Sequence, residues 1–387
     1  MKLEDATKQA LTFTLFLNMK VIRYLRFLDK VCHLFQFFIS FRTERKIKEK
    51  FNKSKNIVIY RVGNIGDIAT VINSLIFMKK IMDKKLILIT SPGNKSGLSS
   101  QFFELTKYGI IDKEIIYYTD SGGISSVKKE LKKYKDYPIY MMTSPLSSLF
   151  STMKQIFYFR ILGFKYITGW EIIHSKIFAK KINKDSVKFN NVICESERLL
   201  RNITSLYKTN YRVFNERIKS EIFKTYKLQK PSKTKEIILA TGAKRATNRW
   251  DKNNYINLIR ELTPRNEITL IGGEQEKEFA ESLMKSFYDI KNKCNKLDIR
   301  ELLKELSGAK LLICNDSGPQ HIAALIHVPT IVTSSSRDIR GRWYPSNPNS
   351  RVLRNEFSCS ACLKEECPKN NLCINSITVF DVISAMK

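Results

Sequence analysis

The stretch Leu311–Ser336 constrains the fold of this 387-residue chain more than any other part of the sequence. An apolar run leads into the polar turn Asn315-Asp316-Ser317-Gly318, and Pro319 then opens a short helical pattern that is followed by a second apolar run. Proline suits the first turn of a helix because the N–H that it lacks would be unpaired there. The free amides of that turn and the helix dipole favour an anion. The stretch therefore predicts a strand–turn–helix–strand unit of a parallel sheet, with an anion site that His321 faces from one helical turn inside.

A second unit of this kind begins near residue 56. The β-branched run Asn56–Val62 predicts a buried parallel strand, and helical spacing returns over Ile68–Lys80. Between them lies Gly63-Asn64-Ile65-Gly66-Asp67, which is neither the three-glycine dinucleotide fingerprint nor a Walker loop. The glycines would let a ligand approach the backbone, and Asp67 places a carboxylate at the mouth of the turn. From these residues alone, capping the helix is a more common role for Asp67 than catalysis.

Strands and helices alternate through the rest of the chain. The first series has strands at Leu86–Thr90, Glu114–Tyr118 and Pro138–Met142, with helices near Val127–Tyr134, Ser144–Leu162 and Glu195–Lys208. After the polar stretch Leu228–Lys235 the alternation restarts, with strands at Glu236–Thr241 and Glu267–Ile271 and helices at Asn253–Leu262, Gln275–Phe287 and Asp298–Ser307. We predict an α/β protein in which two Rossmann-like domains, residues 56–230 and 231–387, face each other across a cleft. Ligands of such sheets bind beyond the carboxyl ends of the strands, so the cleft would collect Asp67 and the 316–321 turn.

Residues 1–55 precede the first strand. Leu11–Phe41 is rich in Leu, Phe and Ile, but its uncharged runs are too short for a spanning helix, and no signal-peptide pattern is present. Basic residues recur there at helical spacing, at Lys20, Arg23, Arg26 and Lys30. This pattern predicts an amphipathic helix, which either lies on an anionic membrane surface or packs on the protein's own core. Arg42–Lys55 is predicted to be a charged connector.

The charge balance indicates anionic partners. With 67 Lys and Arg against 37 Asp and Glu, the net charge is +30, which favours membrane headgroups, phosphorylated glycans or sugar nucleotides. We do not expect nucleic acid as a partner, because zinc-finger, helix-turn-helix and RNA-binding aromatic signatures are missing from the sequence. A cluster of lysines near residue 130 is either a solvated helix face or a site for a phosphorylated acceptor: Lys128, Lys129, Lys132, Lys133 and Lys135.

The cysteines fall into two sets. Four are scattered and are predicted to be small core residues: Cys32, Cys194, Cys294 and Cys314. The other four, with the spacing C-x2-C-x4-C-x5-C, could hold zinc through their thiolates: Cys359, Cys362, Cys367 and Cys373. This spacing is more compact than that of common zinc ribbons, and a reduced packing cluster or a disulfide pair stays open. The small number of scattered cysteines is typical of a cytosolic protein.

Four motifs, taken in order, resemble glycosyltransferase family 9, the bacterial heptosyltransferases of lipopolysaccharide core assembly. They are IVIYRVGNIGDIATVINSL (57–75), the TGA…RW…NY pattern between Thr241 and Tyr255, LIGGEQEKEFAE (270–281), and the D-S-G-x-x-H turn with its following AA and P (316–329). The resemblance extends over about residues 55–387. It implies a GT-B fold and an inverting, metal-independent transfer of a sugar, ADP-heptose being the first donor to consider. The acceptor would be the lipopolysaccharide core or a related anionic surface glycolipid, met by a peripheral protein at the cytoplasmic face of the membrane.

The resemblance also implies roles for individual residues. Asp67 is the implied catalytic base, in a turn formed by Gly63 and Gly66. The implied donor site has Ser317, Gly318 and His321 at the pyrophosphate, Asp316 at the nucleoside, and Gly242, Arg249 and Glu276 nearby, with Glu276 at the ribose. Glu276 could equally be a first-turn carboxylate that meets its helix dipole. The sequence has no D-x-D carboxylate pair for a divalent ion, so helix N-termini and basic side chains would meet the charge of the leaving group.

One departure from the family pattern concerns the donor phosphates. Relatives often have a lysine where this chain has Asn248, so Arg249, Lys244 or Arg245 must take over the phosphate contact. This departure and the N-terminal extension leave a second hypothesis open, a non-catalytic sugar-nucleotide-binding or scaffolding protein at the membrane.

Overall fold

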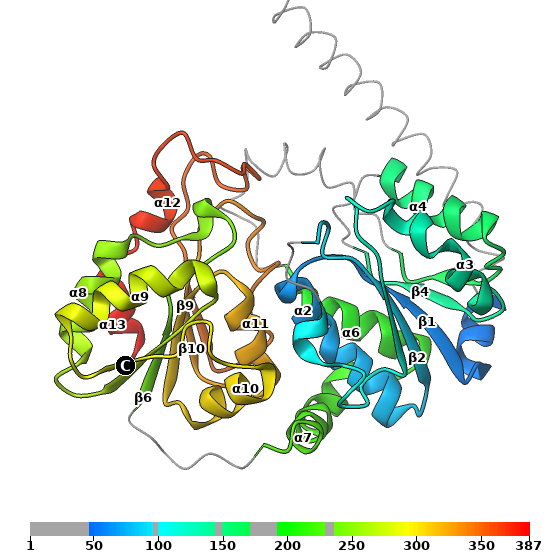
Figure 1. Cartoon of the computed structure of the whole chain (residues 1–387), viewed down its shortest axis with the longest axis horizontal. Helices are drawn as coiled ribbons and strands as arrows, with labels where there is room; N and C mark the ends of the chain where they lie inside the picture. The colour runs from blue at the N-terminus through cyan, green and yellow to red at the C-terminus, as the bar shows by residue number, and fades with distance from the viewer. Residues whose placement is uncertain (1–45, 96–99, 144–148, 171–191, 229–235) are drawn as a thin grey trace, which may run out of the picture.

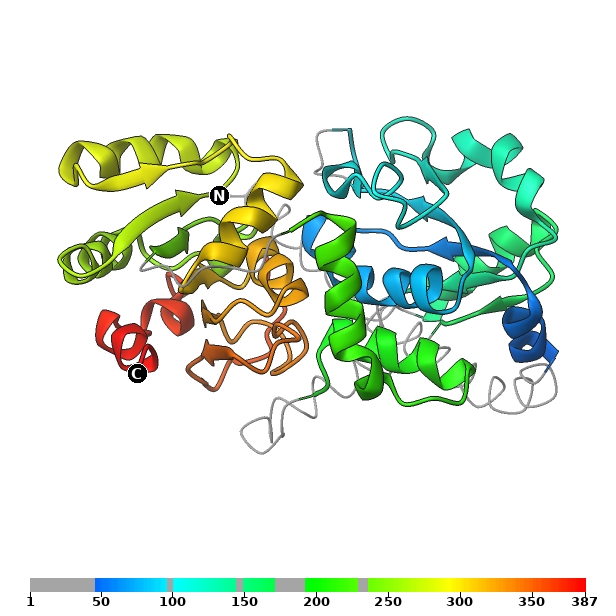
Figure 2. The same ribbon diagram turned by 90° about the horizontal axis from the view of Figure 1, so that it is seen from below.

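The computed structural model describes residues 46–95, 100–143, 149–170, 192–228 and 236–387. Two parallel sheets, each covered by helices, form two lobes side by side (Figures 1 and 2). The predicted α/β class with two Rossmann-like sheets is confirmed. The predicted helix within Leu11–Phe41 lies outside the described residues, as does the polar stretch 229–235 between the two lobes.

The N-terminal lobe is built on a five-stranded sheet in the order β3-β2-β1-β4-β5. β1 lies at its centre because Ile57–Tyr60 are buried on both faces, as a parallel strand between helices requires. The strands are β1 (Asn56–Tyr60), β2 (Lys85–Thr90), β3 (Lys113–Ile116), β4 (Ile139–Met141) and β5 (Ile167–Thr168). The helices are α2 (Ile65–Ile76), α3 (Lys128–Leu131), α4 (Leu149–Ile161), α6 (Glu195–Leu206) and α7 (Asn215–Thr225).

The C-terminal lobe has a six-stranded sheet in the order β11-β10-β9-β6-β7-β8. The Leu311–Ser336 stretch forms its predicted strand–turn–helix–strand unit, with β9 and β10 paired in parallel. The strands are β6 (Glu236–Ala240), β7 (Glu267–Ile271), β8 (Ile290–Asn292), β9 (Leu311–Asn315), β10 (Thr330–Thr333) and β11 (Ser350–Leu353). The helices are α8 (Lys252–Leu262), α9 (Glu274–Ser286), α10 (Ile299–Gly308), α11 (Gly318–Leu325), α12 (Leu372–Asn375) and α13 (Val379–Ala385).

The prediction that Arg42–Lys55 is a charged connector is wrong for residues 46–53, which form a helix. Phe51 in this helix is fully buried, with its ring 5.5 Å from that of Tyr140 and 6.2 Å from that of Tyr207. A single aromatic anchor thus packs an otherwise charged segment onto the N-terminal lobe.

The two lobes meet along α2 and α11. Apolar side chains of both helices, such as Ile72 and Ile322, belong to one continuous buried cluster. The backbone adds a second link, in which the amide of Glu195 donates to the carbonyl of Arg342 over 2.8 Å. The packing therefore fixes how the N-terminal ends of α2 and α11 face each other. Among the helices within the described ranges, none combines the length and apolar character needed to cross a bilayer.

Candidate active site at two facing helix N-termini

The β1–α2 turn and the β9–α11 turn touch each other. A Cβ added to Gly66 would lie 3.6 Å from His321 Cδ2 and 3.7 Å from the Cα of Gly318. Asn64 is the N-cap of α2 and Ser317 the N-cap of α11, so the positive ends of both helix dipoles border the same space. An anion placed there would meet unpaired amides from two helices.

Asp67 lies in the first turn of α2. One carboxylate oxygen accepts from the Asn64 amide at 3.0 Å, and the other accepts from Arg61 Nη2 at 3.3 Å. The side chain is still 31% exposed, so capping the helix does not close it off from a substrate. Gly63, at φ +139°, is needed because a Cβ there would overlap the Asp67 side chain. The turn therefore holds the carboxylate in one place at the mouth of the cleft.

A buried charge network behind Asp67 was missed by the sequence reasoning. Arg61 donates to Glu195 Oε1 over 3.2 Å, and Arg198 donates to the same oxygen over 3.0 Å. Arg61 is 2% exposed and Glu195 is 1% exposed. Burial raises the pKa of Glu195, but the guanidinium groups of Arg198 and Arg61 outweigh it, so the pKa is lowered and the carboxylate stays charged. The signal was Arg61 at the end of an apolar strand, where a charge needs a partner.

His321 lies under the contact between the two turns. It is 7% exposed, and the edge of its ring meets Trp343 with 6.1 Å between ring centroids. Burial lowers the pKa of His321 to about 4, although the carboxylates of Asp67 and Glu195 oppose this shift. The imidazole is therefore neutral at neutral pH, and it can donate one hydrogen bond without carrying charge.

The turn 315–318 is held in place by contacts from a loop, a helix and a strand end. Asn315 is fully buried, and its side-chain oxygen accepts from the Trp250 amide, the Tyr255 hydroxyl and the Thr333 hydroxyl at 3.0–3.1 Å. Asp316 accepts from Gln320 Nε2 at 2.5 Å, and burial together with the nearby carboxylate of Asp338 raises the pKa of Asp316 to about 6. The turn is thus rigid and ready before any ligand arrives.

Asn248, the departure from the family pattern, helps to hold this turn. Its side-chain amide donates to the Asp316 carbonyl over 3.1 Å, and its oxygen accepts from the Ser335 hydroxyl at 2.7 Å. The Asn248 side chain therefore stabilises the turn through hydrogen bonds and is not positioned as a phosphate contact.

The three candidate cations that follow β6 point to different partners. Lys244 links the two lobes, with its Nζ 2.9 Å from Asn64 Oδ1 at the N-cap of α2. Arg245 instead pairs with Glu365 at 3.0 Å. Arg249 donates to the Ala243 carbonyl over 2.7 Å and to Gln275 over 3.3 Å. Of these three, Lys244 alone contacts the turn that carries Asp67.

Glu276 lies in the first turn of α9, where its Oε2 accepts from the Gly273 amide at 2.8 Å. The same carboxylate lies against Gly242, at which any Cβ would overlap it. Its capping contact is therefore present in the structure, and the carboxylate also lies beside the predicted donor residue Gly242.

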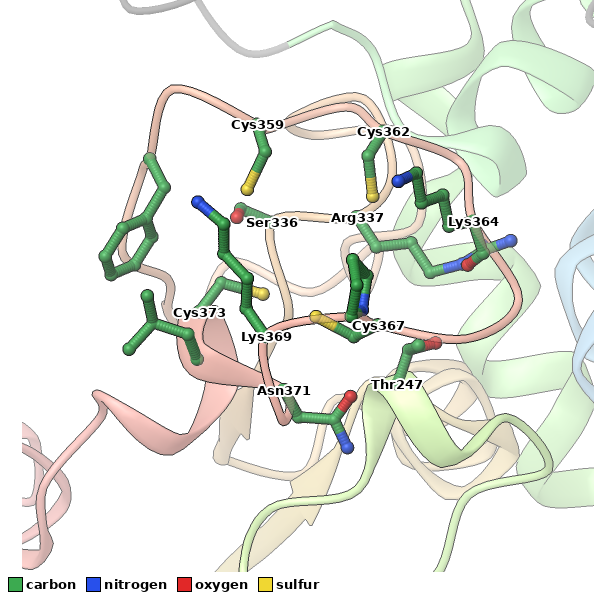
Figure 3. Close-up of a pocket in the computed structure, with 13 residues that line it drawn as sticks. Thr247, Ser336, Arg337, Cys359, Cys362, Lys364, Cys367, Lys369, Asn371 and Cys373 are labelled. Atoms are coloured by element: carbon green, nitrogen blue, oxygen red, sulfur yellow. The ribbon is translucent and has the colours of Figure 1, made fainter.

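Three cysteines of the group lie on the loop that follows β11, and the fourth, Cys373, lies in α12. Cys359, Cys362, Cys367 and Cys373 line a cavity of about 110 Å³, with Arg337 and Lys369 at its wall (Figure 3). None of these four cysteines is in a disulfide. Among the described residues, no three His, Cys, Asp or Glu side chains are grouped tightly enough to hold a metal ion. The predicted core cysteines Cys194, Cys294 and Cys314 are buried, and Cys32 lies outside the described residues.

Comparison with known proteins links this geometry to one family. The family model for glycosyltransferase family 9 (heptosyltransferase) matches residues 125–373, well over half of the chain. Lipooligosaccharide heptosyltransferase 2 of Campylobacter jejuni is 25% identical over 148 residues, which are 37% of this chain. The match spans about half of that relative's length, 47%.

Solved structures share the fold. A family 9 glycosyltransferase from Veillonella parvula gives a TM-score of 0.58 at 14% identity, covering 87% of this chain and 97% of that one. The E. coli heptosyltransferase WaaC with ADP-2-deoxy-2-fluoro heptose gives 0.55 at 15% identity, covering 86% and 98%. The E. coli ADP-heptose lipopolysaccharide heptosyltransferase II gives 0.53 at 15% identity, covering 86% and 97%.

Proposed function

Because the chain belongs to glycosyltransferase family 9, we propose that it is an inverting, metal-independent glycosyltransferase that moves a heptose from ADP-heptose to a lipopolysaccharide core or a related surface glycan. The observation that carries this proposal is the contact between the two turns. It sets the first turn of α2, which carries Asp67, against the N-terminus of α11, which supports a base and a diphosphate site that border one space.

Asp67 is the proposed base. Inversion requires a group that takes the proton of the acceptor hydroxyl while its oxygen attacks the anomeric carbon opposite the leaving group. The exposed part of the Asp67 carboxylate is open to such a hydroxyl, and Arg61 and the Asn64 amide fix its orientation. Gly63 and Gly66 keep the turn narrow enough for the acceptor to approach.

The N-terminus of α11 is the proposed leaving-group site. The amides of Ser317 and Gly318 would bind the donor diphosphate, and neutral His321 would donate a hydrogen bond from behind. Lys244 would supply the positive charge that relatives take from the residue replaced here by Asn248. The helix dipoles and one lysine would thus stabilise the negative charge that develops on the diphosphate as the bond to the sugar breaks. Asp316 would contact the nucleoside, and Glu276 beside Gly242 the ribose, with Arg249 at the edge of the donor site.

We assign the cysteine group no catalytic role in this reaction. Its thiols surround a cavity, and zinc would need all four sulfurs at about 2.3 Å from the ion. Metal analysis of purified protein decides between a zinc site and a reduced cysteine cluster. About one zinc per chain would establish a structural ion, and a protein without zinc would indicate the reduced cluster.

An assay with purified protein tests the proposed function. We expect transfer from ADP-heptose to a heptose-free core glycolipid, with inverted anomeric configuration in the product, and weaker activity with other nucleotide sugars. If the protein binds nucleotide sugars but neither transfers the sugar nor hydrolyses any of the donors tested, the non-catalytic sugar-nucleotide-binding protein is favoured instead.

A further inference from the structure

Helix α4 presents apolar side chains to solvent. Met153, Phe157 and Ile161 follow one another at four-residue spacing and so lie in one line along the helix. Their exposed fractions are 49%, 68% and 62%. The helix also buries Phe159 in the core of the N-terminal lobe, so its apolar line is additional to the one that folding uses. Contiguous exposed apolar surface rimmed by polar residues is typical of interaction sites.

Exposed cations surround this line. The Tyr158 hydroxyl donates to the Ile124 carbonyl over 3.1 Å, and a Cβ on Gly163 would lie 3.2 Å from Lys135 Cδ, so the lysine-rich segment 123–135 lies beside α4 (Figure 1). That segment exposes Lys128, Lys129, Lys132, Lys133 and Lys135. Around α4 itself, Lys154, Arg160 and Lys165 are exposed. Two acidic residues lie among them, Glu130, which pairs with Lys113 at 2.6 Å, and Asp136.

The α4 surface is defined as Met153, Phe157 and Ile161 with these flanking cations, and α4 begins near the sheet edge that carries Asp67. α4 follows β4, and β4 pairs in parallel with β1, so both strands end at that edge. Arg61, which holds Asp67, also donates to the carbonyl of Met142 directly after β4, over 2.8 Å. A partner bound at α4 would therefore lie in the same lobe as Asp67, although Ile161 and Lys135 precede β5 and β4 and lie toward the opposite edge of the sheet.

We propose that the α4 surface docks on an anionic lipid bilayer. The three apolar side chains would enter the boundary between headgroups and acyl chains, while the lysines and Arg160 would meet lipid phosphates. Charge complementarity selects this occupant over an apolar protein face. The inference rests on the proposed function and adds a membrane surface to the lobe that carries the proposed base, but it involves no donor. Vesicle binding in the absence of any sugar nucleotide therefore separates its failure from a failure of the proposed reaction.

Co-sedimentation of the full chain with vesicles gives the first test. We expect binding to phosphatidylglycerol-containing vesicles and little binding to pure phosphatidylcholine. Replacing Phe157 and Ile161 together by Ser should weaken the binding by about tenfold or more, since interfacial affinity follows the apolar area buried. Replacing Lys132 and Lys133 by Ala should weaken it roughly thirtyfold, from about 1 kcal/mol per charge. The matched controls are Phe380→Ser, a residue 77% exposed on α13, and the pair Lys285→Ala and Lys304→Ala.

A reporter at the surface itself gives the second test, because it is insensitive to binding through other segments. In Phe157→Trp, brominated phosphatidylglycerol should quench the added fluorescence, whereas in Phe380→Trp it should not. Equal quenching at the two positions would overturn the proposal. The proposal would also be overturned if light scattering gave the mass of a dimer and Phe157→Ser converted that dimer to a monomer. A second copy of the chain would then cover α4.

Discussion

Lys244 illustrates how one side chain can replace another from a different position in the sequence. Asn248 is occupied by the Asp316 carbonyl and Ser335, and Arg245 by Glu365, whereas Lys244 links the two lobes by reaching the N-cap of α2. A donor diphosphate in the same space would offer Lys244 a stronger, charged acceptor than the Asn64 amide oxygen.

We expect Lys244→Met to weaken the binding of ADP-heptose by about tenfold, because a hydrogen bond to a charged group is lost. Calorimetric titration of the donor measures this effect, with Arg245→Met as the matched control that should bind almost as the unsubstituted chain does. A larger loss in Arg245→Met or Arg249→Met than in Lys244→Met would reassign the phosphate contact.

The buried His321 makes stability depend on pH in a definite direction. Its pKa is lowered to about 4 in the folded protein, whereas the ordinary value is 6.5. Between pH 6.5 and pH 4, the histidine therefore binds a proton more readily in the unfolded chain than in the folded protein. Stability from this group is therefore complete above about pH 6.5 and is lost as the pH falls toward 4.

Urea unfolding at pH 7 and pH 5 should show that the unsubstituted protein loses about 2 kcal/mol more stability than His321→Asn over this interval. An identical loss in both proteins would mean that the imidazole is not held neutral. Donor binding at pH 7 checks that the variant keeps its site.

At the scale of elements, the Arg61–Glu195–Arg198 network joins the end of β1 to the start of α6 and lies directly behind Asp67. Removing the carboxylate would take away the buried negative charge that Arg61 and Arg198 share, while the partly exposed Asp67 would still lie beside Arg61. We expect Glu195→Gln to lower the free energy of unfolding by about 3 to 5 kcal/mol. Glu221→Gln breaks a surface pair with Lys224 and should cost under about 1 kcal/mol. Equal costs in denaturant unfolding would show that the network does not stabilise the fold.

Local patterns predicted the elements well where burial and periodicity coincide. β7 spans Glu267–Ile271 as predicted, and the unit at Leu311–Ser336 formed as expected. The three-residue strand β8 was missed, since few residues carry its pattern, and the 11-residue helix α7 was missed because it buries only Ile218 and Ile222. The helix over residues 46–53 was missed because its one buried side chain, Phe51, is surrounded by charged neighbours.

At the scale of the whole molecule, the sequence predicted that two glycine-containing turns would face one cleft, and the structure brings them into contact. The charge network could not be predicted, because Glu195 resembles an ordinary first-turn acid of a helix and its partners come from distant segments. The choice of Lys244 among three cations likewise depends on the packing of two lobes. Nonlocal pairing of charges is thus the part of the site that local sequence patterns do not encode.

We propose that one space holds both the base and the leaving group, and the Asp67→Asn variant tests this arrangement. Asparagine keeps the shape of the side chain and an oxygen for the Asn64 amide, but it cannot accept the acceptor's proton. We predict that the rate of transfer from ADP-heptose falls by roughly a thousandfold, while the donor dissociation constant and the melting temperature change little. A variant that folds normally and transfers at the full rate would contradict the account.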